Sequence, residues 1–178
     1  MSYTEKLLGI PELIEKILEK PETCQFAASR LVADEHLLYI GRGLDYALSM
    51  EGSLKLKEIS YIHSESYAAG ELKHGTISLI TEDMPVIAVA TQRDVLDKTV
   101  SNIKEVKSRG AFTIVVTREG TDFDKDVADI LVTVPETDDL LMPMTAVVPL
   151  QLIAYYTADL RGNDVDKPRN LAKSVTVE

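Results

Sequence analysis

The sequence predicts an α/β fold of three layers, in which a parallel β-sheet lies between two layers of helices. Short β-branched runs at residues 86–90, 111–117 and 129–134 alternate with stretches of helical periodicity. This alternation is typical of a parallel sheet that is covered on both faces, and strands as apolar as these belong inside such a sheet. No internal repeat, low-complexity tract or linker divides the chain. We therefore expect one domain spanning residues 1–178, with residues 162–178 as a polar C-terminal tail.

The first third of the chain is expected to be mostly helical. Apolar side chains recur at helical spacing near its start, at Leu7, Ile10, Ile14, Ile17 and Leu18. This spacing predicts an amphipathic opening helix, and a second helical stretch follows at residues 21–33. Residues 36–43, HLLYIGRG, indicate a short buried strand that enters a glycine turn, and residues 44–59 indicate the next helix.

Three further helical stretches are expected in the second half. Residues 95–109 have helical periodicity and are followed by Gly110, a typical helix stop, and a shorter helical pattern lies near residues 123–128. A long apolar helix at about residues 140–161 ends at Gly162. Two prolines and a glutamine interrupt its most apolar part, so a buried helix is favoured over a membrane span.

Composition narrows the class of protein. The chain has 178 residues, 45% of them hydrophobic, and a formal net charge of −10. Nucleic acid and anionic membranes both favour basic surfaces, so neither is expected as the main partner. The start of the chain does not resemble a signal peptide, which favours a cytoplasmic protein. Cys24 is the single cysteine, and it is expected to be a buried structural thiol rather than a nucleophile.

The sequence GRG at residues 41–43 lies between the first predicted strand and its helix. A turn of this kind can direct backbone N–H groups at an anion. Its spacing is not that of a full dinucleotide-binding motif, and many strand-to-helix turns use glycine. A structural role is therefore favoured, and a dinucleotide cofactor is not expected.

Lys55 and Glu58 are the first candidates for chemistry. They are three residues apart, which places them on one face of the predicted helix. The simplest interpretation is a surface ion pair. Their sequence neighbours Leu54, Leu56 and Ile59 suggest that this part of the helix borders the core, where a carboxylate can acquire the pKa of a general base.

Histidine and a second lysine complete the candidate set. His74 lies in ELKHG and is the best titrating candidate, whereas His36 and His63 are expected at strand edges. Lys173 lies in the tail, where a lysine is normally solvated. It could form a Schiff base only if the tail folded over a site and desolvated the amine. The spacing of histidines and carboxylates does not match a zinc site, so no metal is expected.

Two long segments carry a resemblance to a known family. They are KLKEISYIHSESYAAGELKHG and DVDKPRNLAKSVTVE, the second preceded by VVPLQLIAYYTADLRGN. Together they resemble the C-terminal end of the glucosamine-6-phosphate synthases, or isomerising glutamine–fructose-6-phosphate aminotransferases. The resemblance covers essentially the whole chain and implies the sugar isomerase (SIS) domain fold, a parallel sheet sandwiched by helices.

The resemblance also implies a role for each candidate residue. Glu58 would move a proton between C1 and C2 of the sugar, and Lys55 would assist at the neighbouring oxygen. Lys173 would form a Schiff base with the keto carbon of fructose 6-phosphate. His74 would open or close the sugar ring, reaching the site from the other subunit of a dimer. Arg169 and Ala172 would belong to the tail that closes the site and binds substrate.

The resemblance further implies partners that this chain lacks. The family's enzymes combine a glutaminase domain with two SIS domains, and this chain matches the second SIS domain. The serine- and threonine-rich loop that binds the sugar phosphate in the first SIS domain is replaced here by TQRD, residues 91–94. Two hypotheses stay open: part of the enzyme that makes glucosamine 6-phosphate from fructose 6-phosphate and glutamine, or a stand-alone SIS module that binds a phosphosugar without catalysis.

Overall fold

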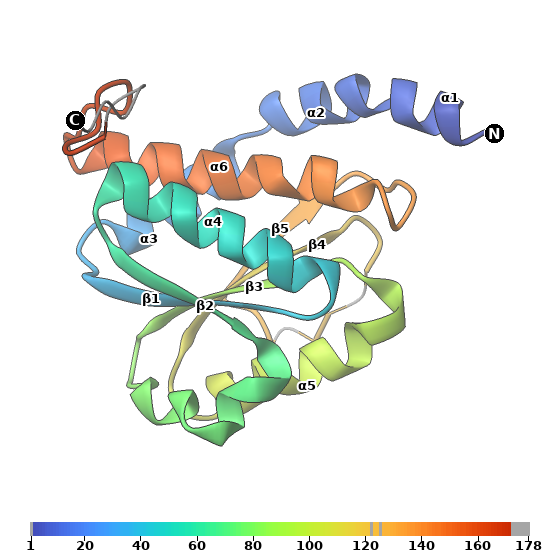
Figure 1. Cartoon of the computed structure of the whole chain (residues 1–178). Helices are drawn as coiled ribbons and strands as arrows, with labels where there is room; N and C mark the ends of the chain where they lie inside the picture. The colour runs from blue at the N-terminus through green and yellow to red at the C-terminus, as the bar shows by residue number, and fades with distance from the viewer. Residues whose placement is uncertain (1, 122, 125, 172–178) are drawn as a thin grey trace, which may run out of the picture.

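The protein, described here as a computed structural model, forms a five-stranded parallel sheet between two layers of helices (Figure 1). The structure describes residues 2–121, 123, 124 and 126–171. The strands are β1 (His36–Gly41), β2 (His63–Ala68), β3 (Pro85–Ala90), β4 (Phe112–Arg118) and β5 (Ile130–Val134). Their order in the sheet is β2-β1-β3-β4-β5, with every pair parallel. The predicted fold class is confirmed.

Two helical layers cover the sheet. The α-helices are α1 (Tyr3–Leu8), α2 (Ile10–Leu18), α3 (Glu22–Leu31), α4 (Leu44–Ser60), α5 (Leu96–Lys107) and α6 (Met142–Leu160). Short 3-10 helices are η1 (Ala69–His74), η2 (Thr76–Leu79) and η3 (Arg93–Val95). In Figure 1, α3, α4 and α6 lie on one side of the sheet, and α5 lies on the other with the 3-10 helices that follow β2.

The alternation of side chains along the strands divides the core in two. Along β1, Leu37 and Tyr39 pack on the side of α3, α4 and α6, whereas Leu38 and Ile40 pack on the side of η1 and α5. Successive residues of a strand point to opposite faces, so an entirely apolar strand is buried on both. Strands β1, β3 and β4 therefore face two separate cores, whereas β5 buries residues on one face only.

The opening helix differs from its prediction. One amphipathic helix was expected, but Gly9 separates α1 from α2, and Pro11 lies in the first turn of α2. Proline lacks an N–H, and its ring collides with the carbonyl four residues earlier in a continuous helix. The periodicity was correct, and the break at Gly9 follows from the proline.

One other local prediction was wrong, and one strand was missed. The helical pattern near residues 123–128 does not form a helix among its described residues, which lie in a turn-rich connection from β4 to β5. Strand β2 was not predicted, because its sequence HSESYA is too polar to resemble the buried strands. It forms one edge of the sheet, paired with β1 alone. The prediction that His36 and His63 are strand-edge residues is confirmed, since each begins a strand and the two are register partners.

Cys24 and α6 are both buried as predicted. The Cys24 thiol lies in the core against α6, and burial raises its pKa to about 11. Such a thiol is largely protonated at neutral pH, which fits a structural role. Helix α6 packs along α3 and α4. Among the residues that the structure describes, none of the helices combines the length and apolar character needed to cross a membrane.

Candidate functional site

Lys55 and Glu58 form an ion pair in the last turns of α4. Lys55 Nζ lies 2.7 Å from Glu58 Oε2 and 3.8 Å from Glu51 Oε1. The side chains of Lys55 and Glu58 are 33% and 30% exposed. The hydrogen bond to Glu58 is the main cause that raises the pKa of Lys55 above its ordinary value. The predicted shared helix face is confirmed, and both groups border solvent rather than lying in the core.

The end of α4 places this pair at the amino edge of the sheet. Helix α4 leaves the carboxyl end of β1 and returns to the start of β2, so it runs antiparallel to both strands. It ends at Tyr61, whose φ of 63° lies in the left-handed region. A residue in this conformation often ends a helix, and it turns the chain sharply into β2.

The C-terminal tail folds back onto the same end of α4. The Asn163 side chain donates hydrogen bonds to the carbonyls of Ile59 and Ser60, at 3.0 and 3.3 Å. The last carbonyls of a helix lack partners within the helix, so Asn163 satisfies two groups that would otherwise need water. Residues 163–171 thus begin against the helix that carries Glu58, as Figure 1 also shows.

Arg169 makes the second tail contact. Its backbone N–H donates to the Tyr61 hydroxyl at 2.9 Å, and its guanidinium lies 4.0 Å from the centre of the Tyr61 ring. A cation over an aromatic ring is attracted by about 0.5–1 kcal/mol at an exposed site. The structure therefore brings together Lys55, Glu58 and Arg169 at one end of α4. Ala172 and Lys173 lie outside the described residues.

His74 is not brought to this end of the molecule. It ends η1, which follows the carboxyl end of β2 and packs through Leu72 into the core on the α5 side. The His74 side chain is 71% exposed, and its Nε2 lies 3.8 Å from Glu71 Oε2. Glu58 and His74 of one chain therefore lie at opposite edges of the sheet and on opposite layers.

The GRG turn has a packing role. A Cβ on Gly41 would lie 2.4 Å from the carbonyl oxygen of Asp45, so only glycine fits where β1 meets α4. Arg42 turns away to the other layer, where its Nε donates to Asn102 at 2.9 Å. Both observations agree with the structural interpretation of this motif.

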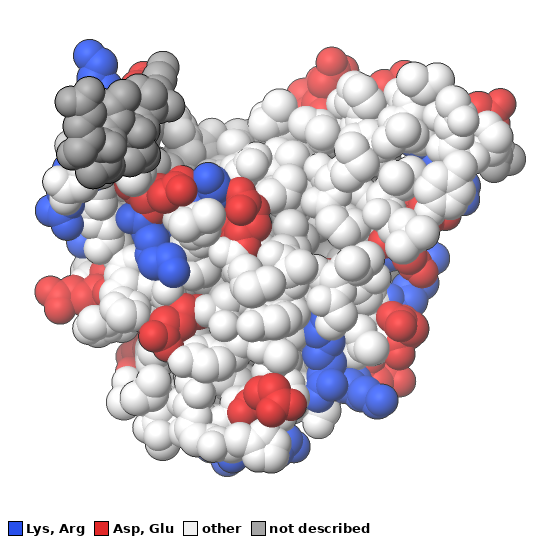
Figure 2. Space-filling view, in the orientation of Figure 1, with Lys and Arg blue, Asp and Glu red and all other residues white. Residues whose placement is uncertain are grey.

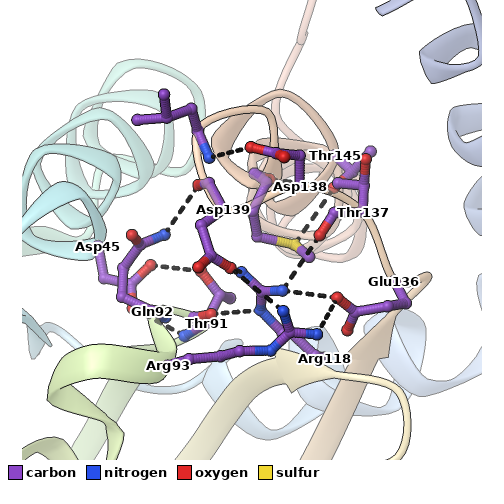
Figure 3. Close-up of polar contacts among 12 residues, drawn as sticks. Asp45, Thr91, Gln92, Arg93, Arg118, Glu136, Thr137, Asp138, Asp139 and Thr145 are labelled. Carbon is purple, nitrogen blue, oxygen red and sulfur yellow. Dashed lines mark hydrogen bonds and ion pairs between the residues drawn. The ribbon is translucent and has the colours of Figure 1, made fainter. Parts of the chain in front are cut away.

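Sequence reasoning missed a buried polar cluster at the carboxyl edge of the sheet (Figure 3). At its centre is Arg118, the last residue of β4, with a side chain only 3% exposed. Its guanidinium donates to the Thr91 carbonyl, to Glu136 at 2.7 Å, to the Thr137 carbonyl at 3.1 Å and to Asp139. The sequence signal for this cluster was Arg118 itself, a charged residue at the end of the otherwise uncharged strand FTIVVTR.

Asp45 is the second centre of this cluster. It is fully buried, and it accepts hydrogen bonds from the backbone N–H of Thr91 at 2.7 Å, the Thr91 hydroxyl at 2.5 Å and the backbone N–H of Gln92 at 3.0 Å. Burial raises the pKa of the Asp45 carboxyl, and these hydrogen bonds with the charge of Arg118 oppose the rise.

A cavity at the amino edge of the sheet has the wrong charge for a sugar phosphate. It measures about 620 Å³ and lies at the amino edge, beside His36 and His63. Five carboxyl groups line it, from Asp34, Glu35, Glu65, Glu82 and Asp83. Like charges repel, so this cavity disfavours a phosphate ester. In the described residues, no group of three or more histidine, cysteine or carboxylate side chains is placed to hold a metal.

Comparison with known proteins agrees with this architecture. A model of the SIS domain matches residues 30–160. The chain is 54% identical over 172 residues to a glutamine–fructose-6-phosphate aminotransferase (isomerizing) of Clostridium acetobutylicum, covering 97% of this chain and 28% of that relative. A Thermococcus kodakarensis protein of the same name is 50% identical over 174 residues, covering 98% of this chain and 29% of that relative. The chain thus spans less than a third of the length of these relatives.

Solved structures give the same result. The C-terminal domain of glucosamine-fructose-6-phosphate aminotransferase from Francisella tularensis superimposes with a TM-score of 0.85 at 38% identity, covering 93% of this chain and 46% of that chain. A glucosamine-6-phosphate deaminase from Thermotoga maritima has a TM-score of 0.65 at 24% identity, which supports the fold alone. With its parallel sheet, its helical layers and a family match over most of its length, the chain belongs to the SIS domain family.

Proposed function

We propose that this chain is the C-terminal SIS domain of an isomerising glutamine–fructose-6-phosphate aminotransferase. Relatives at about 50% identity across nearly all of the chain carry that name. The complete protein would also contain a glutaminase domain and a first SIS domain, and it would make glucosamine 6-phosphate for amino-sugar synthesis, in the cytoplasm. The observation that carries the proposal is the folding of the tail, through Asn163 and Arg169, onto the helix end that holds Lys55 and Glu58.

Glu58 is the proposed base. Its carboxylate is partly exposed at the surface over which the tail folds, so a substrate bound there could meet it. A base that removes a proton from C1 of the sugar and returns it to C2 converts a ketose derivative into an aldose derivative. One carboxylate suffices for both steps, because the proton that it accepts is the proton that it gives back.

Lys55 is proposed to stabilise negative charge on the sugar oxygen. The ion pair with Glu58 raises the pKa of Lys55, so its amine stays protonated at neutral pH. A protonated amine donates hydrogen bonds but cannot attack a carbonyl. Lys55 therefore fits the assisting role, and the resemblance to the family is what makes Lys173 the proposed nucleophile.

Lys173 would reach the site as part of the tail. It follows Arg169 by four residues, and four extended residues span at most about 14 Å. The Arg169 contacts with Tyr61 therefore anchor the tail close enough for Lys173 to serve the α4 end. Arg169 and Ala172 would close the site around the substrate.

His74 is proposed to act from a second copy of the chain. Within one chain it lies at the edge of the sheet opposite to Glu58. It is well exposed, so a neighbouring subunit could receive it. A homodimer that pairs the His74 edge of one subunit with the Glu58 edge of the other would complete the set.

The stand-alone binding module is not favoured. A module that only binds needs neither a base nor a Schiff-base lysine, yet Lys55, Glu58, His74 and Lys173 are all present. The similar full-length proteins are also named as aminotransferases rather than as binding proteins.

Replacing Glu58 by Gln in the full-length enzyme tests the proposal. The amide has the same shape but cannot accept the proton, so isomerisation should fall by roughly 10²–10⁴-fold while sugar binding is retained. The matched control is Glu51→Gln on the same helix, which removes the more distant carboxylate near Lys55. The rate of hydrogen exchange between the sugar and solvent, followed by NMR, is the measurement. A Glu58→Gln enzyme that exchanges this hydrogen at the parental rate does not use Glu58 as its base.

A further inference from the structure

The carboxyl edge of the sheet has a distinctive position between β1 and β3. From β1 the chain passes through α4 to β2 on one side, whereas from β3 it passes through α5 to β4 on the other. Open parallel sheets usually bind their ligands at such a reversal of strand order, outside the carboxyl ends of the strands. The segments that meet here are the start of α4, with Asp45, and residues 91–92 after β3.

Residues 91–92 present three hydrogen-bond donors to one anion. The backbone N–H groups of Thr91 and Gln92 and the Thr91 hydroxyl point at the two oxygens of the Asp45 carboxylate, at 2.5–3.0 Å. The Arg118 guanidinium lies behind them and donates to the Thr91 carbonyl. Converging backbone N–H groups, a hydroxyl and a nearby cation are the elements from which proteins build oxyanion sites.

The anion in this cradle is fixed in place by the protein. Asp45 lies in the first turn of α4 and has no solvent exposure. Ser49 donates to its carbonyl at 2.7 Å, and its own N–H donates to the Arg42 carbonyl at 3.1 Å. Gly41 packs against the same carbonyl without room for a Cβ. These contacts fix the backbone that carries the carboxylate, and the hydrogen bonds from Thr91 and Gln92 hold the carboxylate itself.

The charges around the cradle also disfavour a second anion. Two guanidinium groups, Arg118 and Arg93, pair with the carboxylates of Glu136 and Asp139. The Asp45 carboxylate is a third negative charge beside these two ion pairs, so these five side chains carry a net charge of −1. A phosphate group would bring up to two more charges into a buried region, where repulsion is weakly screened.

The geometry points to Asp45 as a resident anion: its carboxylate occupies an oxyanion cradle formed by Thr91 and Gln92, with Arg118 bonded to the Thr91 carbonyl behind them, and it excludes phosphate groups from the reversal point of this domain. Any phosphosugar handled by this chain must then place its phosphate elsewhere. The inference concerns residues remote from Glu58, and it holds whether or not Glu58 is a base.

Replacing Asp45 by Ala removes the carboxylate and should open the cradle to added anions. Two anions are tested: formate, which has the shape of the deleted carboxylate, and inorganic phosphate, which represents the excluded group. Each is titrated into ¹⁵N-labelled protein at constant ionic strength, and the amide signals of Thr91 and Gln92 are followed. We expect saturable shifts in Asp45→Ala, with a Kd at least about tenfold lower than in the unaltered protein. Tenfold corresponds to about 1.4 kcal/mol, the size of one net hydrogen bond.

Asp45→Asn is the matched control. It removes the same charge, but its side chain still fills the cradle, so neither formate nor phosphate should bind. If Asp45→Ala is unfolded in chloride, its melting curve in formate at equal ionic strength is the readout, and recovery of a folded transition in formate supports the cradle.

Four results would overturn the inference. A folded Asp45→Ala protein without saturable shifts would show that Asp45 only ties α4 to β3, as would an unfolded one that formate does not restore. Shifts with formate but not with phosphate would show that size, rather than Asp45, excludes phosphate. Equal binding by Asp45→Asn would show that relief of charge alone is responsible.

Discussion

At the scale of single residues, Tyr61 connects the helix that carries Glu58 to the tail. It ends α4 in a left-handed conformation, its hydroxyl accepts the Arg169 N–H, and its ring lies under the Arg169 guanidinium. Few other side chains could do all three, because the hydrogen bond needs a hydroxyl and the cation needs an aromatic face. Tyr61, which is outside the proposed catalytic set, therefore holds the tail at Arg169, in addition to the Asn163 contacts.

Replacing Tyr61 by Phe should loosen the tail. The ring and its contact with the guanidinium stay, but the hydrogen bond of about 1 kcal/mol is lost, so the tail should open about fivefold more often. Limited trypsin digestion measures this as faster cleavage after Arg169. Tyr155→Phe on α6 is the control, since it makes the same chemical change at another exposed tyrosine. Equal cleavage rates in the two variants would contradict a holding role for the Tyr61 hydroxyl.

The sequence predicted contacts between residues that are close along the chain, but not contacts between residues that are far apart in the sequence. Lys55 and Glu58 could be placed on one face because helix geometry is local, and their ion pair confirms it. The bond between Asp45 and Thr91 joins residues 46 positions apart. It could not be inferred, because it depends on which strand lies next to β1. A buried charge reveals its partner only after the chain is folded.

At the scale of elements, α1 is attached to the body of the protein by polar contacts. No residue of α1 is buried. Tyr3 and Lys6 both donate to the Asp138 carboxylate, at 2.8 and 2.7 Å. These hydrogen bonds lower the pKa of Asp138 from 3.8 to about 2, with Lys6 the larger cause. In Figure 1 the helix extends away over the end of α6.

The attachment of α1 should therefore depend on pH. Because the folded protein lowers the pKa of Asp138, the contact stabilises α1 fully above pH 4, and the stabilisation is lost as pH falls from about 4 toward 2. Asp138→Asn should mimic the acid state at neutral pH and speed hydrogen exchange of the α1 amides, measured by mass spectrometry. Asp159→Asn at an exposed position of α6 should leave this exchange unchanged. Slow α1 exchange in Asp138→Asn would mean that other contacts hold the helix.

The elements that sequence analysis missed share a physical cause. Strand β2 owes its conformation to pairing with β1, and its polar sequence gives no sign of that pairing. Strand preference depends more on neighbours than on intrinsic tendency, which explains the error. The apolar strands β3 and β4 were found because burial on two faces leaves a signal in the sequence itself. Strand β5 is buried on one face only, and its β-branched residues gave the signal.

At the scale of the whole molecule, the surface is divided between charged and uncharged regions. Figure 2 shows charged side chains of both signs on the left side of the molecule and a broad surface without charge across the middle of the view. The exposed apolar residues of α4 and α6 include Met50, Leu54, Met144 and Tyr155. Exposed apolar surface often marks an interface. If His74 and Glu58 act in one site as proposed, their separation within one chain also requires a second copy.

Dimerisation through these helical faces should be visible in solution. An interface that supports a shared site should exceed about 1,000 Å². Size-exclusion chromatography with light scattering on the 178-residue chain measures the mass, and a clean monomer at tens of micromolar would count against the dimer.

A sharper test mixes inactive variants of the full-length enzyme. If each site combines Glu58 of one subunit with His74 of the other, a Glu58→Gln/His74→Ala heterodimer contains one intact site out of two. Random exchange makes half of the dimers mixed, so about a quarter of the parental activity should return. Sites built within one chain would regain nothing, because every chain carries one defect.

The isolated chain is expected to lack synthase activity and to bind fructose 6-phosphate weakly. Its net charge of −10 repels a dianion. The Asp45 carboxylate already fills the cradle after β3, so the charge-assisted hydrogen bonds that usually hold a phosphate have no counterpart there. Calorimetric titration with fructose 6-phosphate measures the binding, and borohydride trapping with mass spectrometry detects any Schiff base on Lys173. Micromolar binding, or a reduced sugar adduct on Lys173, would mean that this domain forms a complete site without the rest of the enzyme.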